Sequence, residues 1–201
     1  MSVGRKPYLE DLGIEKAGIE LNDNKKGIQV NLKMQTNIDN IYAIGDVTNI
    51  MQLAHVASHQ GIVAVENIMG EVAEMDYSAI PSAIFTHPEI ATVGLTEKEA
   101  KSKGMNIEVG KFPYAANGKA LTVGDERGFI KVIKDRDSSK VVGAAIIGIN
   151  SADIIASLAL AVKNGLTTKQ IVETVFTHPT TAEVIHEAAL SAEGGAIHFA
   201  K

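Results

Sequence analysis

A histidine and a glutamate near the end of the chain could work together as an acid–base pair. They are His178 and Glu183, the two ends of the segment HPTTAE. A carboxylate that holds one imidazole nitrogen fixes the tautomer and orientation of the ring, as a base that shuttles protons to and from a nucleophile requires. The segment has a second interpretation, because Thr180 and Glu183 also form the pattern of a helix capping box. The residues alone leave both interpretations open.

The chain shows no nucleophile for such a base. It has no cysteine, so it forms no disulfide, thiolate metal site or redox thiol of its own, and it has no hydrolase-type serine elbow. We therefore expect a piece of a larger protein, or reacting atoms that come from a partner. A metal site could be drawn from His178, Glu183, His186 and Glu187, but it lacks the helical i, i+4 histidine pair, so we expect no metal. His87, which also precedes a proline, is most simply part of a turn.

A second candidate site follows the apolar segment Ile41–Ile44, which we expect to be a short strand buried on both faces. The segment ends at Gly45 and Asp46, where open α/β sheets bind ligands. The Asp46 carboxylate could accept hydrogen bonds from sugar hydroxyls. A helix expected over residues 52–69 would point its positive end at the same place and favour an electron-rich group. The spacing alone favours the simpler interpretation, in which Gly45 and Asp46 form only a turn.

The elements that must position these residues fall into two parts that differ in charge. Residues 1–77 carry a net charge of −5 and residues 78–201 are neutral. In the first part, glycines and a polar turn predict a surface-rich connector with a small hairpin around residues 19–32. The second part is expected to form an antiparallel sheet with helices. Its expected strands are 83–86, 91–93, 107–113, 129–134 and 141–148. Its expected helices are 96–104 (opened by a capping box of Thr96 and Glu99), 152–164 (capped by Ser151), one opening at 167–170, and one from just after Pro179 to about 193.

The composition argues against several functions. Apolar residues make up 45% of the chain, enough for a substantial core. The absence of tryptophan, the 4% aromatic content and the lack of a basic stripe argue against a nucleic-acid partner. The longest apolar runs are about half a membrane span, and no charged-then-apolar leader is present. We therefore expect no membrane association and a cytoplasmic location.

Six segments together resemble the flavin-dependent pyridine nucleotide–disulfide oxidoreductases. They occur in the order seen in that family and cover essentially the whole chain. The segments are GRKPYLEDLG, MQTNIDNIYAIGDV, LAHVASHQGIVAVENIMG, FTHPEIATVGLTEKEA, VGKFPYAANGKAL and HPTTAEVIHEAA. Within the family, KFPYAANGKAL and LAHVASHQG are more similar to the lipoamide dehydrogenase branch than to glutathione or mercuric reductases. The resemblance is to the C-terminal portion only, somewhat under half of such an enzyme.

The resemblance implies a role for each candidate residue. Asp46, next to Gly45, matches the aspartate that hydrogen-bonds the FAD ribitol. The backbone of Leu53-Ala54-His55 matches the helix start that faces the pyrimidine end of the flavin. His178 matches the catalytic base and Glu183 the carboxylate that orients it, and both act on the redox site of the other subunit of a homodimer.

The resemblance also implies a fold class and a division of the chain. The expected class is α/β, with residues 1–77 as the end of an NAD domain and a partial FAD-domain segment, and residues 78–201 as an α+β interface domain. The family's glycine-rich FAD and NAD loops and its redox-active cysteine pair are absent from the chain. The segment 148–153 (GINSAD) differs from the usual GPxAxE, so its family role does not carry over.

The implied parent enzyme would oxidise dihydrolipoamide with FAD and NAD, in contact with the lipoyl-bearing protein of a multienzyme complex. We expect this chain alone to be inactive and to bind no cofactor stoichiometrically. Two alternatives are a different dithiol or disulfide reductase of the family and a stand-alone dimerisation module without chemistry. A pure scaffold has no need of an oriented base, so the His178–Glu183 pair disfavours the second alternative.

Overall fold

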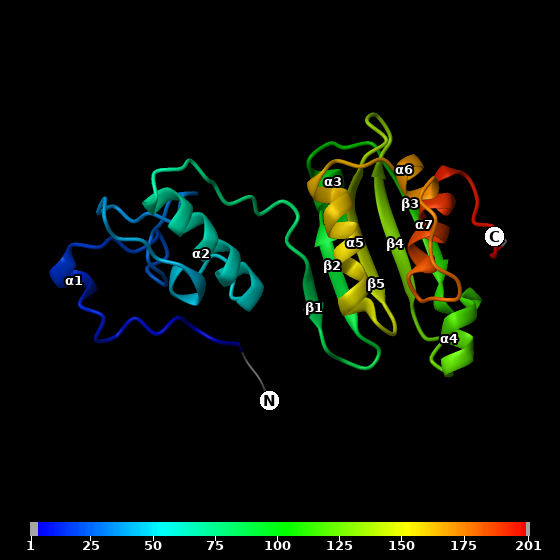
Figure 1. Cartoon of the computed structure of the whole chain (residues 1–201), viewed down its shortest axis with the longest axis horizontal. Helices are drawn as coiled ribbons and strands as arrows, with labels where there is room; N and C mark the ends of the chain where they lie inside the picture. The colour runs from blue at the N-terminus through cyan, green and yellow to red at the C-terminus, as the bar shows by residue number, and fades with distance from the viewer. Residues whose placement is uncertain (1–3, 200–201) are drawn as a thin grey trace. The chain divides into compact units, whose positions relative to one another are not determined.

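The computed structural model describes residues 4–199 of the chain. The chain divides into two compact units, residues 1–77 and residues 78–201 (Figure 1). Within the described residues, no helix is both long enough and apolar enough to cross a membrane.

The first unit has little regular secondary structure. Its elements are α1 (Ile14–Ala17), the 3-10 helix η1 (Gly45–Thr48) and α2 (Ala54–Ile68). Met34, Val56 and Val63 are buried in its small core. The expected hairpin is reduced to a single antiparallel bridge between Leu21 and Ile28.

The prediction of a buried strand at Ile41–Ile44 is wrong. Only Tyr42 makes a strand-like bridge, to Gln35, and the Ile44 side chain is exposed. A strand buried on both faces needs paired neighbours and covering layers. The described part of this unit offers the segment only that one bridge, so its apolar character does not produce a strand.

The second unit is built on a five-stranded antiparallel sheet with the order β1-β2-β5-β4-β3. All five expected strands are present, with small shifts at their ends. Their bounds are β1 (Ser82–Ile84), β2 (Ile90–Gly94), β3 (Ile107–Pro113), β4 (Phe129–Asp135) and β5 (Val141–Ile147).

One face of this sheet is apolar. The register places Phe112 opposite Ile130, Ile130 opposite Ile146 and Ile146 opposite Ala91, and all four are buried. Directly opposite residues of antiparallel strands point to the same face, so these side chains form one continuous surface. Two helices cover it, α5 (Ser151–Lys163) over β2 and β5 and α7 (Glu183–Glu193) over β3 and β4, while the short α6 (Thr168–Val172) packs on α7 (Figure 1).

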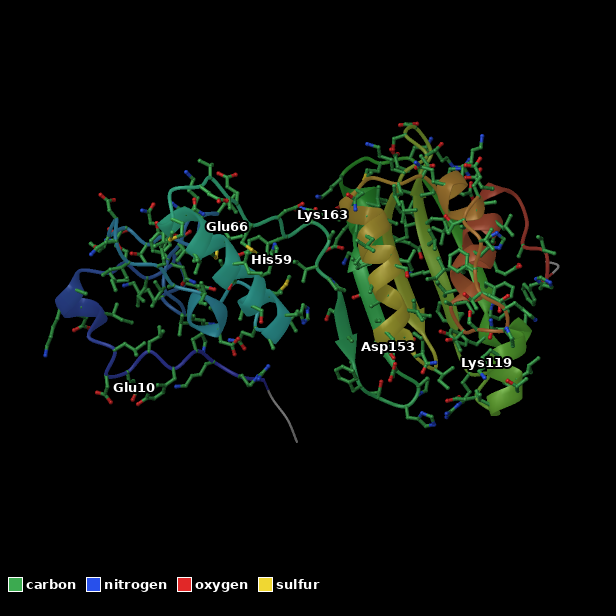
Figure 2. All side chains as sticks on the ribbon, in the orientation of Figure 1. Glu10, His59, Glu66, Lys119, Asp153 and Lys163 are labelled. Atoms are coloured by element: carbon green, nitrogen blue, oxygen red, sulfur yellow. The ribbon has the colours of Figure 1, made fainter. Side chains whose placement is uncertain are left out.

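The helix α5 packs on the sheet through one apolar stripe. Ile155, Leu158 and Ala161 recur at helical spacing and are buried against the sheet. Asp153, labelled in Figure 2, is exposed on its other side. Leu160 is exposed as well. The helix therefore has one inward stripe, and Leu160 belongs to an apolar patch that this chain leaves uncovered.

The opposite face of the sheet is more polar. Lys111 and Lys131 lie opposite each other on it. Lys131 forms an ion pair of 2.7 Å with Glu97 at the start of α3 (Glu97–Ser102). The capping box predicted for α3, between Thr96 and Glu99, is present with both hydrogen bonds.

Two expectations about helix starts were wrong, and two short helices were missed. Ser151 does not cap α5, because its hydroxyl donates to the Gly148 carbonyl; the Ala152 amide instead donates to Glu89 at 3.1 Å. The helix α7 begins at Glu183 rather than just after Pro179. The 3-10 helix η2 (Tyr114–Ala116) and α4 (Gly118–Val123) were not expected at all.

Candidate functional site

The His178–Glu183 pair is formed in the structure. His178 lies in the loop between α6 and α7, and its Nδ1 is 2.9 Å from Oε1 of Glu183, the first residue of α7. The other carboxylate oxygen, Oε2, accepts a hydrogen bond of 2.8 Å from the Thr180 amide. The Thr180 hydroxyl donates to the Thr177 carbonyl, so only half of a capping box exists. Glu183 therefore satisfies both interpretations of the sequence at once, with one oxygen for each.

The protonation state of Glu183 decides which nitrogen of His178 carries the proton. Burial raises the pKa of Glu183. The hydrogen bonds from the Thr180 amide and from His178 together lower this pKa by more than burial raises it, so that it lies below its usual value. At neutral pH the carboxylate is ionised and can only accept hydrogen bonds. His178 must then donate from Nδ1, which leaves a lone pair on Nε2 when the ring is neutral.

The Nε2 atom of His178 is open to the surroundings. The side chain is 76% exposed, and within residues 4–199 no atom hydrogen-bonds to Nε2. Such a ring can take a proton from an incoming group and return it, while the carboxylate on the far side stabilises the imidazolium. The arrangement can serve as an acid–base pair.

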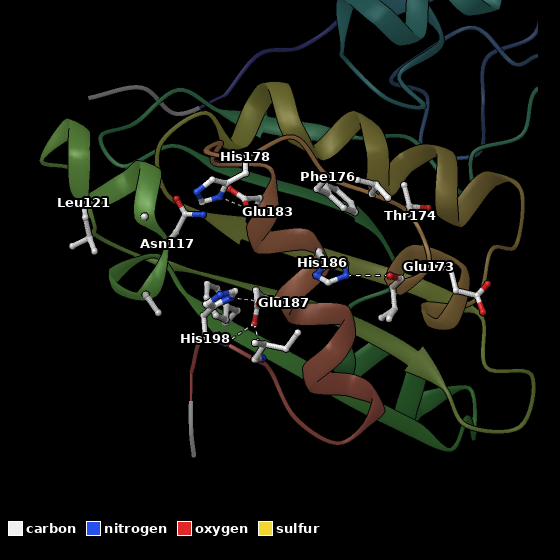
Figure 3. Close-up of a pocket in the computed structure, with 16 residues that line it drawn as sticks. Asn117, Leu121, Glu173, Thr174, Phe176, His178, Glu183, His186, Glu187 and His198 are labelled. Atoms are coloured by element: carbon white, nitrogen blue, oxygen red, sulfur yellow. Dashed lines mark hydrogen bonds and ion pairs between the residues drawn. The ribbon is translucent and has the colours of Figure 1, made fainter.

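The pair stands at the edge of a pocket of about 560 Å³ (Figure 3). Its walls come from β3, α4, the loop between α6 and α7, α7, and the segment after α7. The lining is largely apolar, with Phe112, Leu121, Val172, Phe176 and Ile197 among its residues. An apolar pocket wall next to an exposed imidazole suits an apolar ligand that carries a weakly acidic group.

A second histidine–glutamate pair lines the same pocket one helical turn further along α7. Glu187, only 5% exposed, accepts hydrogen bonds from the amides of Ile197 and His198 and contacts Nδ1 of His198 at 2.7 Å. The Nε2 atom of His186 donates a hydrogen bond of 3.1 Å to the Val172 carbonyl oxygen. These groups are engaged separately, and within residues 4–199 no three His, Asp or Glu side chains converge as metal ligands.

Asp46 lies in the first unit, in the 3-10 helix η1, with its side chain exposed. Gly45 before it has φ +72°, a left-handed conformation that favours glycine, and an added Cβ would lie 3.2 Å from Ala57 of α2. The Gly45 amide donates to the buried side chain of Gln60 at 2.6 Å, and Gln60 in turn donates to the Tyr77 hydroxyl at 2.9 Å. The hydrogen bond from Gly45 to Gln60 of α2 therefore holds the turn that carries Asp46.

The helix start near Asp46 has no side-chain cap. Leu53 is the N-cap residue of α2, and Ala54 and His55 begin the helix. The positive end of the helix dipole favours an electron-rich group. The Asp46 carboxylate can accept hydrogen bonds from hydroxyl groups, and the free amides at the start of α2, which contacts η1, can donate to an electron-rich group. These residues fit a ligand that has both kinds of group.

Three polar residues with a structural part in these sites were missed by the sequence analysis: Gln60, Glu89 and Asn117. Gln60 holds the Gly45 turn and Glu89 caps α5. Asn117 caps α4 through the Ala120 amide at 2.9 Å and donates to the Thr180 carbonyl at 3.1 Å. An asparagine before a short helix is a recognisable cap signal, but nothing local points to its second partner.

The second unit combines a helix-covered antiparallel sheet with a histidine that is oriented by a carboxylate. The family model for the pyridine nucleotide-disulphide oxidoreductase dimerisation domain matches residues 80–189, and the model for pyridine nucleotide-disulphide oxidoreductases matches residues 1–61. The chain belongs to the pyridine nucleotide-disulphide oxidoreductase family.

Curated relatives extend this similarity over the whole chain. The dihydrolipoyl dehydrogenase of Chlamydia muridarum is 46% identical over 99% of the chain, and that of Bacillus subtilis is 45% identical over 100% of it. In both cases the match covers 43% of the relative. The chain thus spans well under half the length of the curated relatives it matches.

Solved structures agree on the fold. LpdA of Mycobacterium tuberculosis aligns with a TM-score of 0.88 and 29% identity, over 94% of this chain and 41% of its own. The HOCl-induced flavoprotein disulfide reductase RclA of Escherichia coli aligns with a TM-score of 0.84 and 28% identity, over 93% of this chain and 43% of its own.

Proposed function

We propose that this chain acts as the C-terminal part of a dihydrolipoyl dehydrogenase, which oxidises dihydrolipoamide and passes the electrons to NAD through FAD. Relatives of that name support the activity, and the oriented His178–Glu183 pair is the single observation that carries it. The proposal includes a homodimer, a cytoplasmic location and a lipoyl-bearing protein as the donor of the substrate. Residues 1–77 would complete an NAD domain and contribute to an FAD domain, and residues 78–201 would form the interface.

The role of the pair follows from its geometry. In its neutral form, His178 accepts a proton at Nε2 from one thiol of the substrate, and the resulting thiolate is the reactive nucleophile. Glu183 keeps the ring in the required tautomer and stabilises the imidazolium that forms. The thiolate attacks a disulfide, forms a mixed disulfide and releases the other sulfur as a thiolate. The chain has no cysteine, so that disulfide would come from other residues.

The first unit would contribute part of the cofactor site. Bound FAD would supply the electron transfer between the dithiol and NAD. Asp46 would accept hydrogen bonds from the ribitol hydroxyls on the turn at Gly45, and the backbone of Leu53-Ala54-His55 would favour an electron-rich flavin edge. These contacts amount to a few hydrogen bonds, too few for tight dinucleotide binding. We therefore propose that the chain alone neither retains FAD stoichiometrically nor turns over.

A chimera tests the role of His178. The C-terminal 43% of the Bacillus subtilis dihydrolipoyl dehydrogenase is replaced by this chain, and His178→Gln is introduced. Oxidation of dihydrolipoamide is expected to fall roughly 100- to 10,000-fold, the usual contribution of a general base. Reduction of the flavin by NADH, followed by stopped-flow absorbance, should stay close to that of the unsubstituted chimera, because that half-reaction moves a hydride and does not use the base.

The matched control is His87→Gln. His87 also precedes a proline and its side chain is 75% exposed, against 76% for His178. It should leave both half-reactions unchanged. If His178→Gln impairs both half-reactions equally, or if His87→Gln has the same effect, His178 is not the base.

A further inference from the structure

We propose that Asn117 is a positioning residue that holds the His178–Glu183 pair in working geometry, an inference that rests on the function proposed for that pair. Asn117 is 4% exposed and lies between η2 and α4, far from His178 in the sequence. Its side-chain amide donates to the Thr180 carbonyl at 3.1 Å. Thr180 lies between His178 and Glu183 in the chain, so this bond acts on the loop that joins the two members of the pair.

The loop is held from both sides at the same residue. The Thr180 amide donates to Oε2 of Glu183, and the Thr180 carbonyl accepts from Asn117. The two bonds fix both peptide groups that flank Thr180, which is two residues after His178. Loss of the Asn117 bond would free one of them and weaken the constraint on the orientation of His178.

Asn117 is itself held rigidly. Its Oδ1 accepts from the Ala120 amide at the start of α4, and its Nδ2 donates to Thr180, so the two ends of the side-chain amide are fixed by main-chain groups of opposite polarity. Of the similar-sized side chains, only an amide both accepts and donates in this way. The contact from Asn150 to the Thr181 hydroxyl is longer, at 3.3 Å, and reaches the loop through a rotatable group.

The position of Asn117 in the pocket agrees with this role. Asn117, His178 and Glu183 all line the same cavity, and Figure 3 shows the Asn117 side chain beside the pair. Because its hydrogen bonds are made to main-chain groups, its effect on the chemistry passes through the loop. It orients the base and does not exchange protons itself.

Two substitutions remove the donation and keep the cap. Asn117→Asp retains an acceptor for the Ala120 amide but places an oxygen against the Thr180 carbonyl. Asn117→Ser also caps the helix, carries no charge and is too short to reach Thr180. Asn164→Asp makes the same chemical change at an exposed asparagine of this unit, whose Nδ2 donates to the Leu160 carbonyl, and serves as the matched control.

The readout is the tautomer of His178 in the full 201-residue chain, from the 15N shifts of its imidazole above pH 8. The wild-type chain and Asn164→Asp are expected to hold the proton on Nδ1. In both Asn117 variants the ratio of the Nδ1–H to the Nε2–H form should fall roughly two- to tenfold, as expected for the loss of one hydrogen bond. Backbone amide spectra that match the wild type elsewhere would show that the variants are folded.

Two results would overturn the inference: variants of Asn117 that keep the wild-type tautomer ratio, or a wild-type His178 without a preference for Nδ1–H. Neither depends on turnover. A chimera in which His178→Gln has no effect would instead reject the proposed function, so the two failures can be told apart.

Discussion

At the scale of single residues, Glu183 does two jobs with one carboxylate. It holds the His178 ring with Oε1 and the Thr180 amide with Oε2. Both partners donate, so both bonds require the ionised form. The orientation of the His178 ring and the local fold of the loop therefore depend on the same charge.

The pH dependence of stability follows from the pKa of Glu183. Burial alone would raise it, but the bonds from Thr180 and His178 leave the folded pKa below the ordinary value of 4.5. A carboxyl with a lowered folded pKa stabilises the fold above the unfolded pKa and loses that contribution as the pH falls through the folded pKa. Glu183→Gln should cost about 1 kcal/mol at pH 7 and nothing once the pH is well below 4.

Urea unfolding of the chain between pH 3 and pH 7 measures this difference. Glu126→Gln is the control, because Glu126 is exposed and has no hydrogen bond to another residue in the range 4–199. A difference between Glu183→Gln and the wild type that stays constant across the pH range would show that the bonds do not depend on the charge.

The sequence predicted the histidine–glutamate pair of the site, but it did not predict the residues that hold the surrounding loops and helices in place. His178 and Glu183 are five residues apart, so one loop and the start of one helix bring them together. Asn117 and Glu89 contact partners 63 residues away, at Thr180 and Ala152. A local sequence pattern cannot predict contacts between residues so far apart in the chain. These residues come together only because the folded sheet positions the helices and loops that carry them.

At the scale of elements, the close approach of α7 to β3 depends on Gly110. A Cβ at that position would lie 2.0 Å from the Ala188 carbonyl oxygen and 2.5 Å from the Ala192 nitrogen, both in the main chain of α7. The helix can rest on the strand only because this side chain is missing. Glu183 is the first residue of the same helix, so the contact also sets the position of the site.

Gly110→Ala should therefore push α7 away from the sheet and destabilise the second unit by about 3 kcal/mol. Gly118→Ala is the control, since nothing lies within 4 Å of its added Cβ and the position is helical. The control should be neutral or slightly stabilising. Chemical unfolding of both variants gives the comparison, and equal stability of the two would mean that α7 shifts at no cost.

The sequence predicted the elements that are recognisable from their own residues, without information about their neighbours in space. Alternating or continuous apolar residues with clear turns were enough for all five strands of the second unit. The capping box at Thr96 and the polar segment 167–170 marked two helix starts. The strand expected at 41–44 failed because a buried strand is defined by its neighbours. The helix α4 was missed because its cap residue, Asn117, was not recognised as a helix start.

At the scale of the whole molecule, the second unit leaves an apolar surface uncovered. Val175 is 95% exposed and Leu160 is 64% exposed. Both line a groove of about 410 Å³ between α5 and α7. A dimerisation domain of this family is expected to bury such a surface against a second copy, and a two-fold contact uses the same patch on both subunits.

We expect the chain to have twice its 21.3 kDa mass in solution, and residues 78–201 to fold and dimerise alone. Val175→Lys should produce monomers at micromolar concentration, because it would place one charge from each subunit in the apolar surface that the dimer is expected to bury. Val72→Lys is the control, since Val72 is 81% exposed but belongs to the first unit. Light scattering decides: a wild-type mass of 21.3 kDa, or equal effects of the two variants, would contradict this assignment.

The strand order β1-β2-β5-β4-β3 also has a consequence for synthesis on the ribosome. Strands β3, β4 and β5 pair with neighbours in the sequence, but Ala91 of β2 pairs with Ile146, which is made 55 residues later. At about 5–20 residues per second, β2 waits roughly 3–11 s for its partner. During that time the edge of β2 that will pair with β5 has no partner, while its other edge can already pair with β1.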